Sequence, residues 1–285
     1  MRLPGPASGV EIETIRAKAA HENFPVASWF LPKKTRRHMM AIYCFARKTD
    51  DLGDETGRDA STTLVLLDRW QSEFEGALEG FAADPVLAQV SRTIVECALD
   101  RRPFLDLIES NRRDQTVNRY DTFEDLRGYC RLSAEPVGRL VLAVNGVLTP
   151  ERTRWSDDVC TGLQLTEHWQ DIVEDMNRGR IYLPRQDMAE FGVTESDVLS
   201  SRMTPEFSGL MAFEVERARS LLLAVKPLAR SVKGRLRLAI VGFAAGGLAA
   251  LDAIEASGYN VFRNRLEGNK RGLVRNAIRL LGVRL

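Results

Sequence analysis

The sequence lacks several motifs that mark common classes of enzyme. It has only three histidines and no HExxH motif, which argues against a histidine-based zinc hydrolase. Its four cysteines are widely spaced and form no CxxC pair, so neither a zinc site nor a disulfide scaffold is indicated. Neither GxxxxGK[ST] nor GxGxxG occurs, and a nucleotide held by a glycine-rich loop is therefore not expected.

A basic excess and a long apolar run are also missing. The chain has 40 Lys and Arg against 39 Asp and Glu, which argues against a general nucleic-acid binder. The longest nearly apolar run, residues 238–251, is shorter than the roughly 20 residues of a membrane span, so we expect a buried core helix. The N-terminus shows no apolar signal region. We therefore expect a soluble, cytoplasmic protein with reduced thiols.

Alternating β-branched runs with Asn-Gly or Asp-Gly turns are absent, whereas helical periodicity is frequent. The clearest apolar stripe has alternating spacings of four and three residues, at Met211, Val215, Ala218, Leu222 and Val225. Most prolines separate stretches of this kind. The pattern predicts one all-α domain over residues 1–285, with about the first ten residues and the last few loosely held.

One group of polar side chains follows a helical stripe in the N-terminal half. Tyr43, Arg47, Asp50 and Asp54 are spaced by four, three and four residues, which places them on one helix face. Two carboxylates one turn apart on a dry face repel each other, and a divalent cation removes that cost. The alternative is a solvated acidic helix end.

A second polar stripe lies in the other half of the chain. It consists of Gln164, Glu167, Asp171, Asp175 and Arg178. Carboxylates from facing helices build metal sites in bundle cores, and Mg²⁺ prefers oxygen ligands shared with substrate phosphates. Arg47, Arg178 and Arg180 lie beside the acidic residues, and we expect them to complement phosphate oxygens. We therefore expect the two stripes to face one cavity that binds Mg²⁺ and the diphosphate of an apolar substrate.

These motifs resemble the squalene and phytoene synthases, a family of trans-isoprenyl diphosphate synthases. The resemblance covers most of the chain, in the family's order and spacing: residues 43–47 with 50–54, 114–115, 129–130, 136–138, 163–166 with 171–175, and 178–184. It implies a single-domain helical bundle of the isoprenoid synthase type with a central apolar cavity.

Two segments resemble one branch of the family, the bacterial hydroxysqualene synthases of hopanoid pathways. They are residues 22–28, Glu-Asn-Phe-Pro-Val-Ala-Ser, and the Trp169-Gln170 pair. The resemblance implies that presqualene diphosphate and water give hydroxysqualene and diphosphate. The chain departs from the family pattern at Glu167, where Asn is usual, and at Glu135, where Gly is usual. The exact metal arrangement is therefore open.

The resemblance implies roles for individual residues. The predicted catalytic residues are Asp50, Asp54, Asp171, Asp175, Tyr129 and Glu167. All of these except Tyr129 are also the predicted Mg²⁺ ligands. The predicted substrate-binding residues are Tyr43, Arg47, Asp114, Gln164, Arg178, Tyr259, Arg263 and Arg265. Glu167 and His168 are candidates to position the water, with a packing role as the alternative for His168.

Two other functions stay open. One is a head-to-head condensing synthase that makes presqualene diphosphate, squalene or phytoene. The other is a non-catalytic subunit that binds prenyl diphosphates.

A C-terminal helix with arginines at 271, 275 and 279 is either a membrane-surface helix or an ordinary surface helix. Contact with the inner face of the membrane, and with the enzyme that makes presqualene diphosphate, therefore stays open too. No nucleic-acid partner is expected.

Overall fold

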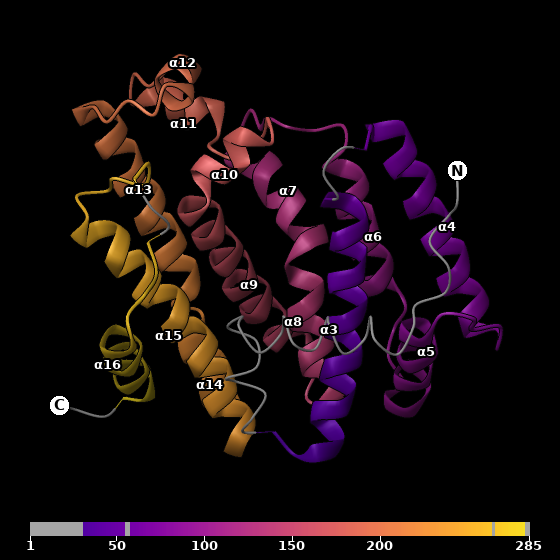
Figure 1. Ribbon diagram of the computed structural model, residues 1–285. Helices are drawn as coiled ribbons and strands as arrows, with labels where there is room; N and C mark the ends of the chain where they lie inside the picture. The colour runs from indigo at the N-terminus through magenta and orange to yellow at the C-terminus, as the bar shows by residue number, and fades with distance from the viewer. Residues whose placement is uncertain (1–30, 55–57, 264–265, 283–285) are drawn as a thin grey trace.

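The structure is a computed structural model that describes residues 31–54, 58–263 and 266–282. All regular elements in these ranges are helices (Figure 1), which confirms the predicted all-α class. They are α3 (Lys33–Asp54), α4 (Ala60–Leu78), α5 (Pro85–Cys97), α6 (Arg102–Arg113), α7 (Phe123–Ser133), α8 (Glu135–Val144), α9 (Pro150–Gln170), α10 (Ile172–Asn177), α11 (Arg185–Glu190), α12 (Glu195–Leu199), α13 (Pro205–Leu222), α14 (Val225–Ser231), α15 (Gly234–Ala256) and α16 (Lys270–Leu281). Residues 22–28 and Arg265 lie outside the described ranges, as do the first ten and last three residues.

Local sequence signals determine where several helices begin. α5, α9 and α13 each start with a proline, and the preceding Asp84, Thr149 or Thr204 accepts a hydrogen bond from a backbone N–H of the first turn. Proline suits this position because the first N–H groups of a helix have no partner within the helix. The prolines therefore separate helices, as the sequence predicts.

The second acidic stripe is not one continuous helix, which corrects the sequence-based expectation. α9 ends at Gln170, and Asp171 (φ −105°, ψ 17°) joins it to the short α10. The Asp171 N–H still donates to the Glu167 carbonyl, and the Asp175 N–H donates to the Asp171 carbonyl. No Gly or Pro marks the bend, so local propensity does not predict it. After α10 the chain turns back, and the Ile181 N–H donates to the Asn118 carbonyl.

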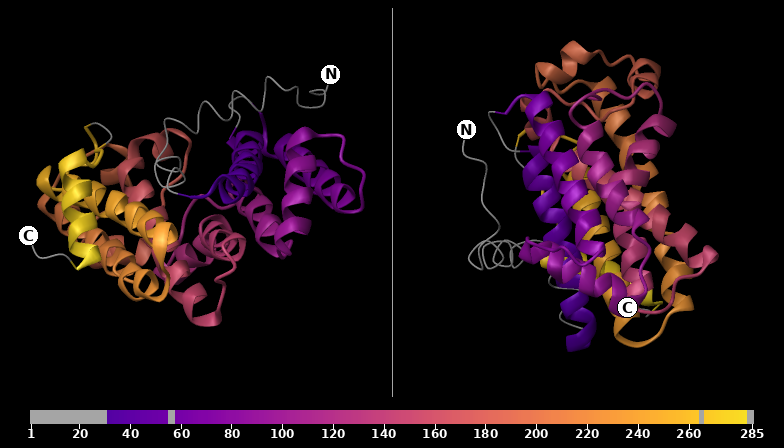
Figure 2. Two further views of the ribbon diagram at one scale, coloured as in Figure 1. Left: turned by 90° about the horizontal axis from the view of Figure 1, so that it is seen from below. Right: turned by 90° about the vertical axis from the view of Figure 1, so that its right-hand side faces the viewer.

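Two hydrophobic clusters form the core of the bundle. One lies mainly among α3, α4, α5 and α6, and the other mainly among α7, α9, α13, α14 and α15. Figures 1 and 2 show these two groups side by side as the N-terminal and C-terminal halves of the molecule. α8 and α15 contribute to both clusters, for example through Leu140 and Ala239 to the first and Leu142 and Val241 to the second. Each half supplies one of the two acidic motifs.

The apolar run at residues 238–251 lies in α15, which is longer than the run itself. At 23 residues, α15 is the helix of the described part whose length and hydropathy would suit a membrane span, but 61% of that stretch is buried inside the protein. Close packing explains the glycine at position 247, where a Cβ would lie 2.8 Å from Leu163 and 3.1 Å from Leu222; no described atom outside the helix itself lies within 4 Å of a Cβ built on Gly242 or Gly246. The expectation of a core helix is therefore confirmed.

Candidate active site

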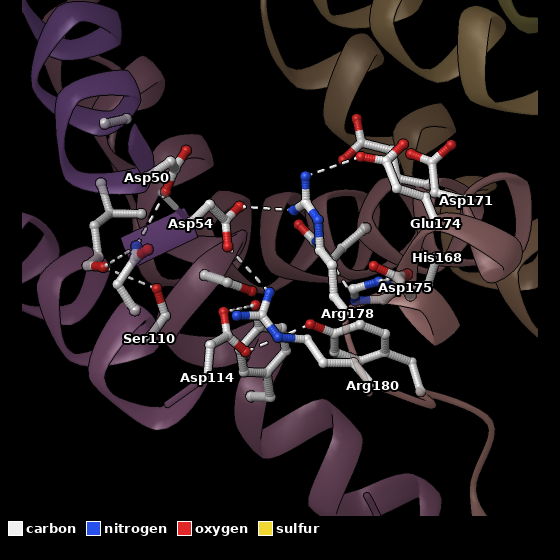
Figure 3. Close-up of a pocket in the computed structure, with 18 of the residues that line it drawn as sticks. Asp50, Asp54, Ser110, Asp114, His168, Asp171, Glu174, Asp175, Arg178 and Arg180 are labelled. Atoms are coloured by element: carbon white, nitrogen blue, oxygen red, sulfur yellow. Dashed lines mark hydrogen bonds and ion pairs between the residues drawn. The ribbon is translucent and has the colours of Figure 1, made fainter. Parts of the chain in front are cut away.

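A cavity of about 750 Å³ lies between the two halves (Figure 3). Its walls come from α3, α6, α7, α8, α9 and α10 and from the segment that follows α10. Most of the lining is charged or polar, and Ala46, Leu107 and Val137 provide aliphatic surface. Ten predicted site residues line it: Arg47, Asp50, Asp54, Asp114, Tyr129, Gln164, Glu167, Asp171, Asp175 and Arg178.

The first carboxylate cluster occupies the last two turns of α3. Asp50 accepts a hydrogen bond of 3.0 Å from the Asn111 Nδ2 of α6. The Asp50 carboxylate is open to the cavity but lies deep among protein atoms. This burial, together with the nearby negative charge of Asp54, raises the pKa of Asp50 to about 6. A bound cation would relieve both effects.

The second carboxylate cluster surrounds the bend between α9 and α10. Glu167 belongs to α9, Asp171 lies at the bend, and Glu174 and Asp175 belong to α10. Figure 3 shows Asp171, Glu174 and Asp175 on the side of the cavity opposite Asp50 and Asp54. The two acidic motifs therefore do face one cavity.

Two arginines cross the space between the clusters. Arg178 Nη1 lies 3.1 Å from Asp54 Oδ2, and its Nη2 lies 2.9 Å from Glu174 Oε1. Arg180 Nη1 lies 3.1 Å from the other oxygen of Asp54. Burial by itself lowers the pKa of Arg180, but Asp114 and Asp54 outweigh it and raise the pKa. Both guanidinium groups therefore carry permanent positive charge at the position where an anionic ligand would meet the carboxylates.

Two tyrosines and an aspartate form a hydrogen-bonded network near Arg180. The Tyr129 hydroxyl donates to Asp114 Oδ2 over 2.8 Å, and the Tyr182 hydroxyl lies 3.4 Å from Asp114 Oδ1. Burial raises the pKa of Asp114 to about 6, although Arg180 and Tyr129 oppose the shift. Burial and the charge of Asp114 hold the pKa of Tyr129 well above its ordinary value. Tyr129 therefore keeps its proton and acts as a hydrogen-bond donor.

His168 lies in the wall between the second carboxylate cluster and this network. Its ring stacks on Tyr182 with centroids 3.6 Å apart, and its Nδ1 lies 3.8 Å from Asp175 Oδ2. Its Nε2 is 3.4 Å from the Gln164 amide nitrogen. His168 thus packs against the tyrosines and also lines the cavity.

The donor set fits Mg²⁺ shared with a phosphate ligand better than an enclosed metal cage. The lining carboxylates are hard oxygen donors from two separate clusters. Within the described ranges, no group of three or more His, Cys, Asp or Glu side chains converges tightly enough to hold a metal alone. Mg²⁺ commonly uses one or two carboxylates together with substrate phosphates. The assignment of Mg²⁺ ligands stays a prediction.

Four predicted substrate-binding residues are not among the residues that line the cavity. Tyr43 is buried in the core between α3 and its neighbours. Tyr259 is partly buried against the C-terminal core at φ 63°, and Arg263 is exposed. Arg265 lies outside the described ranges. Glu135 is also not part of the lining, because its carboxylate faces Arg139 and Thr161. The substrate-binding roles of Tyr43, Tyr259, Arg263 and Arg265 stay predictions.

The structure adds residues that the predicted site set omits. Arg180, Asn111 and Tyr182 each contact a predicted residue and line the cavity. Asn111 lies three residues before Asp114, so helical spacing contained a signal for it. Tyr182 lies in a segment without regular structure, where spacing does not determine the direction of a side chain. Arg180, in the same segment, is one of the arginines that the sequence predicts beside the phosphate, and it lines the cavity next to Asp54.

Fold and site together define a class of protein: an all-helical bundle whose central cavity pairs facing carboxylates with arginines. The match to a family model narrows the class, because the squalene/phytoene synthase model covers residues 17–271. The chain belongs to the squalene/phytoene synthase family.

Individual relatives agree with this membership. The chain is 33% identical to a phytoene synthase of Arthrospira platensis, over 86% of this chain and 83% of that protein. It is 36% identical to a hydroxysqualene synthase of Rhodopseudomonas palustris, over 74% and 72%. The crystal structure of squalene synthase HpnC from Alicyclobacillus acidocaldarius is similar at 44% identity and a TM-score of 0.81, over 87% of this chain and 94% of that one. A dehydrosqualene synthase structure with 24% identity and a TM-score of 0.83 shows the same fold.

Proposed function

We propose that the protein is a hydroxysqualene synthase that ionises presqualene diphosphate and adds water to the resulting carbocation. The observation that carries the proposal is the cavity itself, in which two carboxylate clusters and two arginines surround space for a diphosphate. The choice within the family rests on the 36% identity with the hydroxysqualene synthase of Rhodopseudomonas palustris. Residues 22–28 and the Trp169-Gln170 pair support the same branch.

In this proposal the charged residues bind and orient the diphosphate. Asp50, Asp54, Asp171 and Asp175, with Glu167, would hold Mg²⁺. Bound Mg²⁺ neutralises charge on the leaving diphosphate. Arg178 and Arg180, which both lie beside Asp54, are placed to contact the remaining phosphate oxygens, and the nearby charge of Asp114 favours the charged form of Arg180. Removal of charge from the leaving group lowers the barrier to breaking the C–O bond.

The second half of the reaction needs one water molecule at the right carbon. Glu167 and His168 are polar groups on the α9 side of the cavity, and we propose that they position this water. The aliphatic surface of Ala46, Leu107 and Val137 faces the same space and would contact the hydrocarbon chain. Elsewhere in the cavity, exclusion of water protects the cation.

A head-to-head condensing synthase is the second candidate. Phytoene synthases are frequent among the relatives at 31–34% identity, including those of Arthrospira platensis and Zea mays. A condensing enzyme binds two prenyl diphosphates, whereas the proposed reaction uses one substrate and water. Substrate preference therefore separates the two candidates.

The experiment is product analysis of the purified protein with Mg²⁺ and, in separate reactions, presqualene diphosphate, farnesyl diphosphate or geranylgeranyl diphosphate. We expect hydroxysqualene from presqualene diphosphate and no consumption of farnesyl diphosphate. Conversion of farnesyl diphosphate to a C30 product, or of geranylgeranyl diphosphate to phytoene, would replace the proposal with the condensing function.

A non-catalytic role is tested with the double variant Asp50→Asn and Asp171→Asn. Each substitution removes one carboxylate charge from a different cluster and keeps the side-chain size. We expect the variant to lose complementation of a cell that lacks the enzyme. Retained complementation would favour a binding subunit without catalytic function.

The substrate proposed here is a lipid, which bears on where the protein acts. We propose a cytoplasmic protein that works at the inner face of the membrane and receives presqualene diphosphate from the enzyme that makes it. Separation of cell lysate into soluble and membrane fractions tests the location, and co-purification with the upstream enzyme tests the contact.

A further inference from the structure

The charge of the chain is unevenly distributed along the sequence. Residues 217–285 contain 14 Lys and Arg but only three Asp and Glu, although the whole chain has 40 and 39. The rest of the chain is therefore acidic. Because the positive and negative charges of the whole chain nearly cancel, the net charge of +1 does not reveal this asymmetry.

Folding brings together three helices that carry much of this positive charge. α14 and α15 both pack against α16. Figure 1 shows α14 and α16 at the lower left of the molecule, away from α10 at the top. We name the exposed cations of these three helices and their connections the basic face: Lys226, Arg230, Lys233, Arg235, Lys270, Arg271, Arg275 and Arg279.

Most of these cations have no acidic partner. Arg275 pairs with Asp252 over 2.8 Å, but the other seven form no ion pair with any residue that the structure describes. α16 contains four Lys and Arg and no acidic residue. The positive charge of the basic face is therefore available to an external anion rather than neutralised within the protein.

An apolar hollow lies within the basic face. The α16 residues Lys270, Arg271, Val274, Arg275 and Ile278 line a shallow depression of about 440 Å³. Val274 is 53% exposed at this position, although it is a large aliphatic residue. Lys and Arg place aliphatic stems beside such surface and keep their charges in water. An exposed apolar patch rimmed by cations is typical of a helix that lies in a membrane interface.

We propose that the basic face binds an anionic phospholipid bilayer, with Val274 entering the interface and the surrounding cations contacting lipid phosphates. A nucleic acid would bind the cations through its phosphates but would make no contact that requires the apolar hollow. An acidic protein partner would contact both the cations and the hollow, and the experiment below distinguishes it from a bilayer. The benefit to the reaction rests on the proposed function: a C30 diphosphate and its alcohol product both partition into lipid, so docking keeps the enzyme near its substrate.

The test is flotation of the purified full-length protein with vesicles and without substrate. We expect binding to vesicles of phosphatidylcholine mixed with phosphatidylglycerol, and much weaker binding to phosphatidylcholine alone. Rising salt should weaken the binding, because the cations are exposed. Since no substrate is present, the result is independent of the proposed chemistry, which product analysis in detergent tests separately.

A charge-reversal pair and a matched control locate the binding surface. Arg271→Glu with Arg279→Glu should weaken binding to anionic vesicles at least about 30-fold, because each cation near such a surface contributes about 1 kcal/mol. The control is Arg92→Glu with Arg101→Glu, which changes net charge equally on exposed residues of α5 and of the turn before α6. We expect the control to bind nearly as the parent protein does.

Val274→Ser tests the apolar contribution without a change of charge, and it should weaken vesicle binding severalfold. Circular dichroism melts check that each variant is folded. Equal binding to neutral and anionic vesicles, equal loss in the test and control pairs, or no binding to any vesicle would each overturn the proposal. The last result would favour a protein partner for the basic face.

Discussion

At the residue scale, Gly53 allows α6 to approach the first carboxylate cluster. A Cβ on Gly53 would lie 2.1 Å from Asn111 Oδ1, and the Gln115 amide donates to the Gly53 carbonyl over 3.1 Å. Asn111 in turn donates to Asp50. The absence of a side chain at position 53 is therefore required for the hydrogen bond that orients Asp50.

We expect Gly53→Ala to destabilise the protein by about 1–3 kcal/mol through overpacking, even though Ala favours helix by about 1 kcal/mol. Turnover should also fall, because a displaced Asn111 no longer orients Asp50. Urea denaturation and steady-state kinetics measure the two effects. The control is Gly76→Ala in α4, where the nearest atom to a new Cβ is 3.9 Å away. An equal gain in stability for both variants would contradict the packing argument.

Tyr129 offers a second prediction at this scale. Tyr129→Phe removes the hydrogen bond to Asp114, the carboxylate whose nearby charge raises the pKa of Arg180. Since a hydrogen bond to a charged group contributes about 1.5–3 kcal/mol, we expect kcat/KM to fall about tenfold or more while the fold is kept. Kinetics with the proposed substrate measure the change.

Tyr120→Phe is the matched control for Tyr129→Phe. Tyr120 stacks on Tyr182 in the same aromatic group, but its buried hydroxyl has no hydrogen-bond partner among the described residues. Its loss should leave kcat/KM within about twofold of the parent value. Equal losses in both variants would mean that the aromatic packing, rather than the Tyr129 hydroxyl, matters.

At the scale of elements, a buried charge cluster joins α13 to α11. Arg217 of α13 contacts Asp187 of α11 over 2.6 Å and Glu214 over 2.9 Å, so one guanidinium serves two carboxylates. Burial, with the neighbouring charge of Asp187, raises the pKa of Glu214 to about 8. Near neutral pH Glu214 therefore holds a proton in the folded state that the unfolded chain has lost.

This shift makes stability depend on pH. The folded state binds more protons than the unfolded chain between about pH 4.5 and 8, so stability should fall as the pH rises through this range. Glu214→Gln keeps a neutral hydrogen-bonding group and should flatten the dependence, with higher stability than the parent at pH 8. Urea midpoints from pH 5 to 9 measure it.

Glu216→Gln is the control for this titration, because Glu216 is exposed two residues away on the same helix. Its curve should follow that of the parent protein. The shifted pKa would be contradicted if the stability of the parent protein rose from pH 5 to 8. It would also be contradicted if stability depended on pH in Glu214→Gln as steeply as in the parent.

At the scale of the whole molecule, the cavity shares its aromatic and aliphatic wall residues, such as Tyr129, Tyr182 and Leu107, with the two hydrophobic clusters. The clusters consist of buried aliphatic and aromatic residues, and the carboxylates of the cavity contribute to neither. A metal bound at the cavity would therefore serve the reaction rather than the fold.

We expect a chelator such as EDTA to abolish turnover and to change the Tm by no more than about 2 °C, which for a protein of this size corresponds to roughly 1 kcal/mol. Added Mg²⁺ should restore turnover, whereas added Na⁺ at equal ionic strength should not. Calorimetry and product analysis on one sample make the comparison. A large fall in Tm on chelation would assign the metal a structural role.

The sequence by itself determined the class of fold and the two acidic motifs. Helical periodicity, caps and prolines are local signals, and they act over a few residues wherever the chain lies. The spacing of Asp50 and Asp54 within α3 is of this kind. The family resemblance also follows from the sequence, because it depends on the order of motifs rather than on their distances in space.

Only the tertiary structure decided which groups meet. The bend at Asp171, the contacts of Asp54 with Arg178 and Arg180, and the pairing of Asp114 with Tyr129 all join separate elements. Such contacts depend on how the two core clusters pack against each other. That packing is determined by many side chains that are far apart in the sequence, and no local pattern contains it. The basic face has the same origin: its charges are scattered along residues 226–279, and the packing of α14 and α15 against α16 makes them one surface.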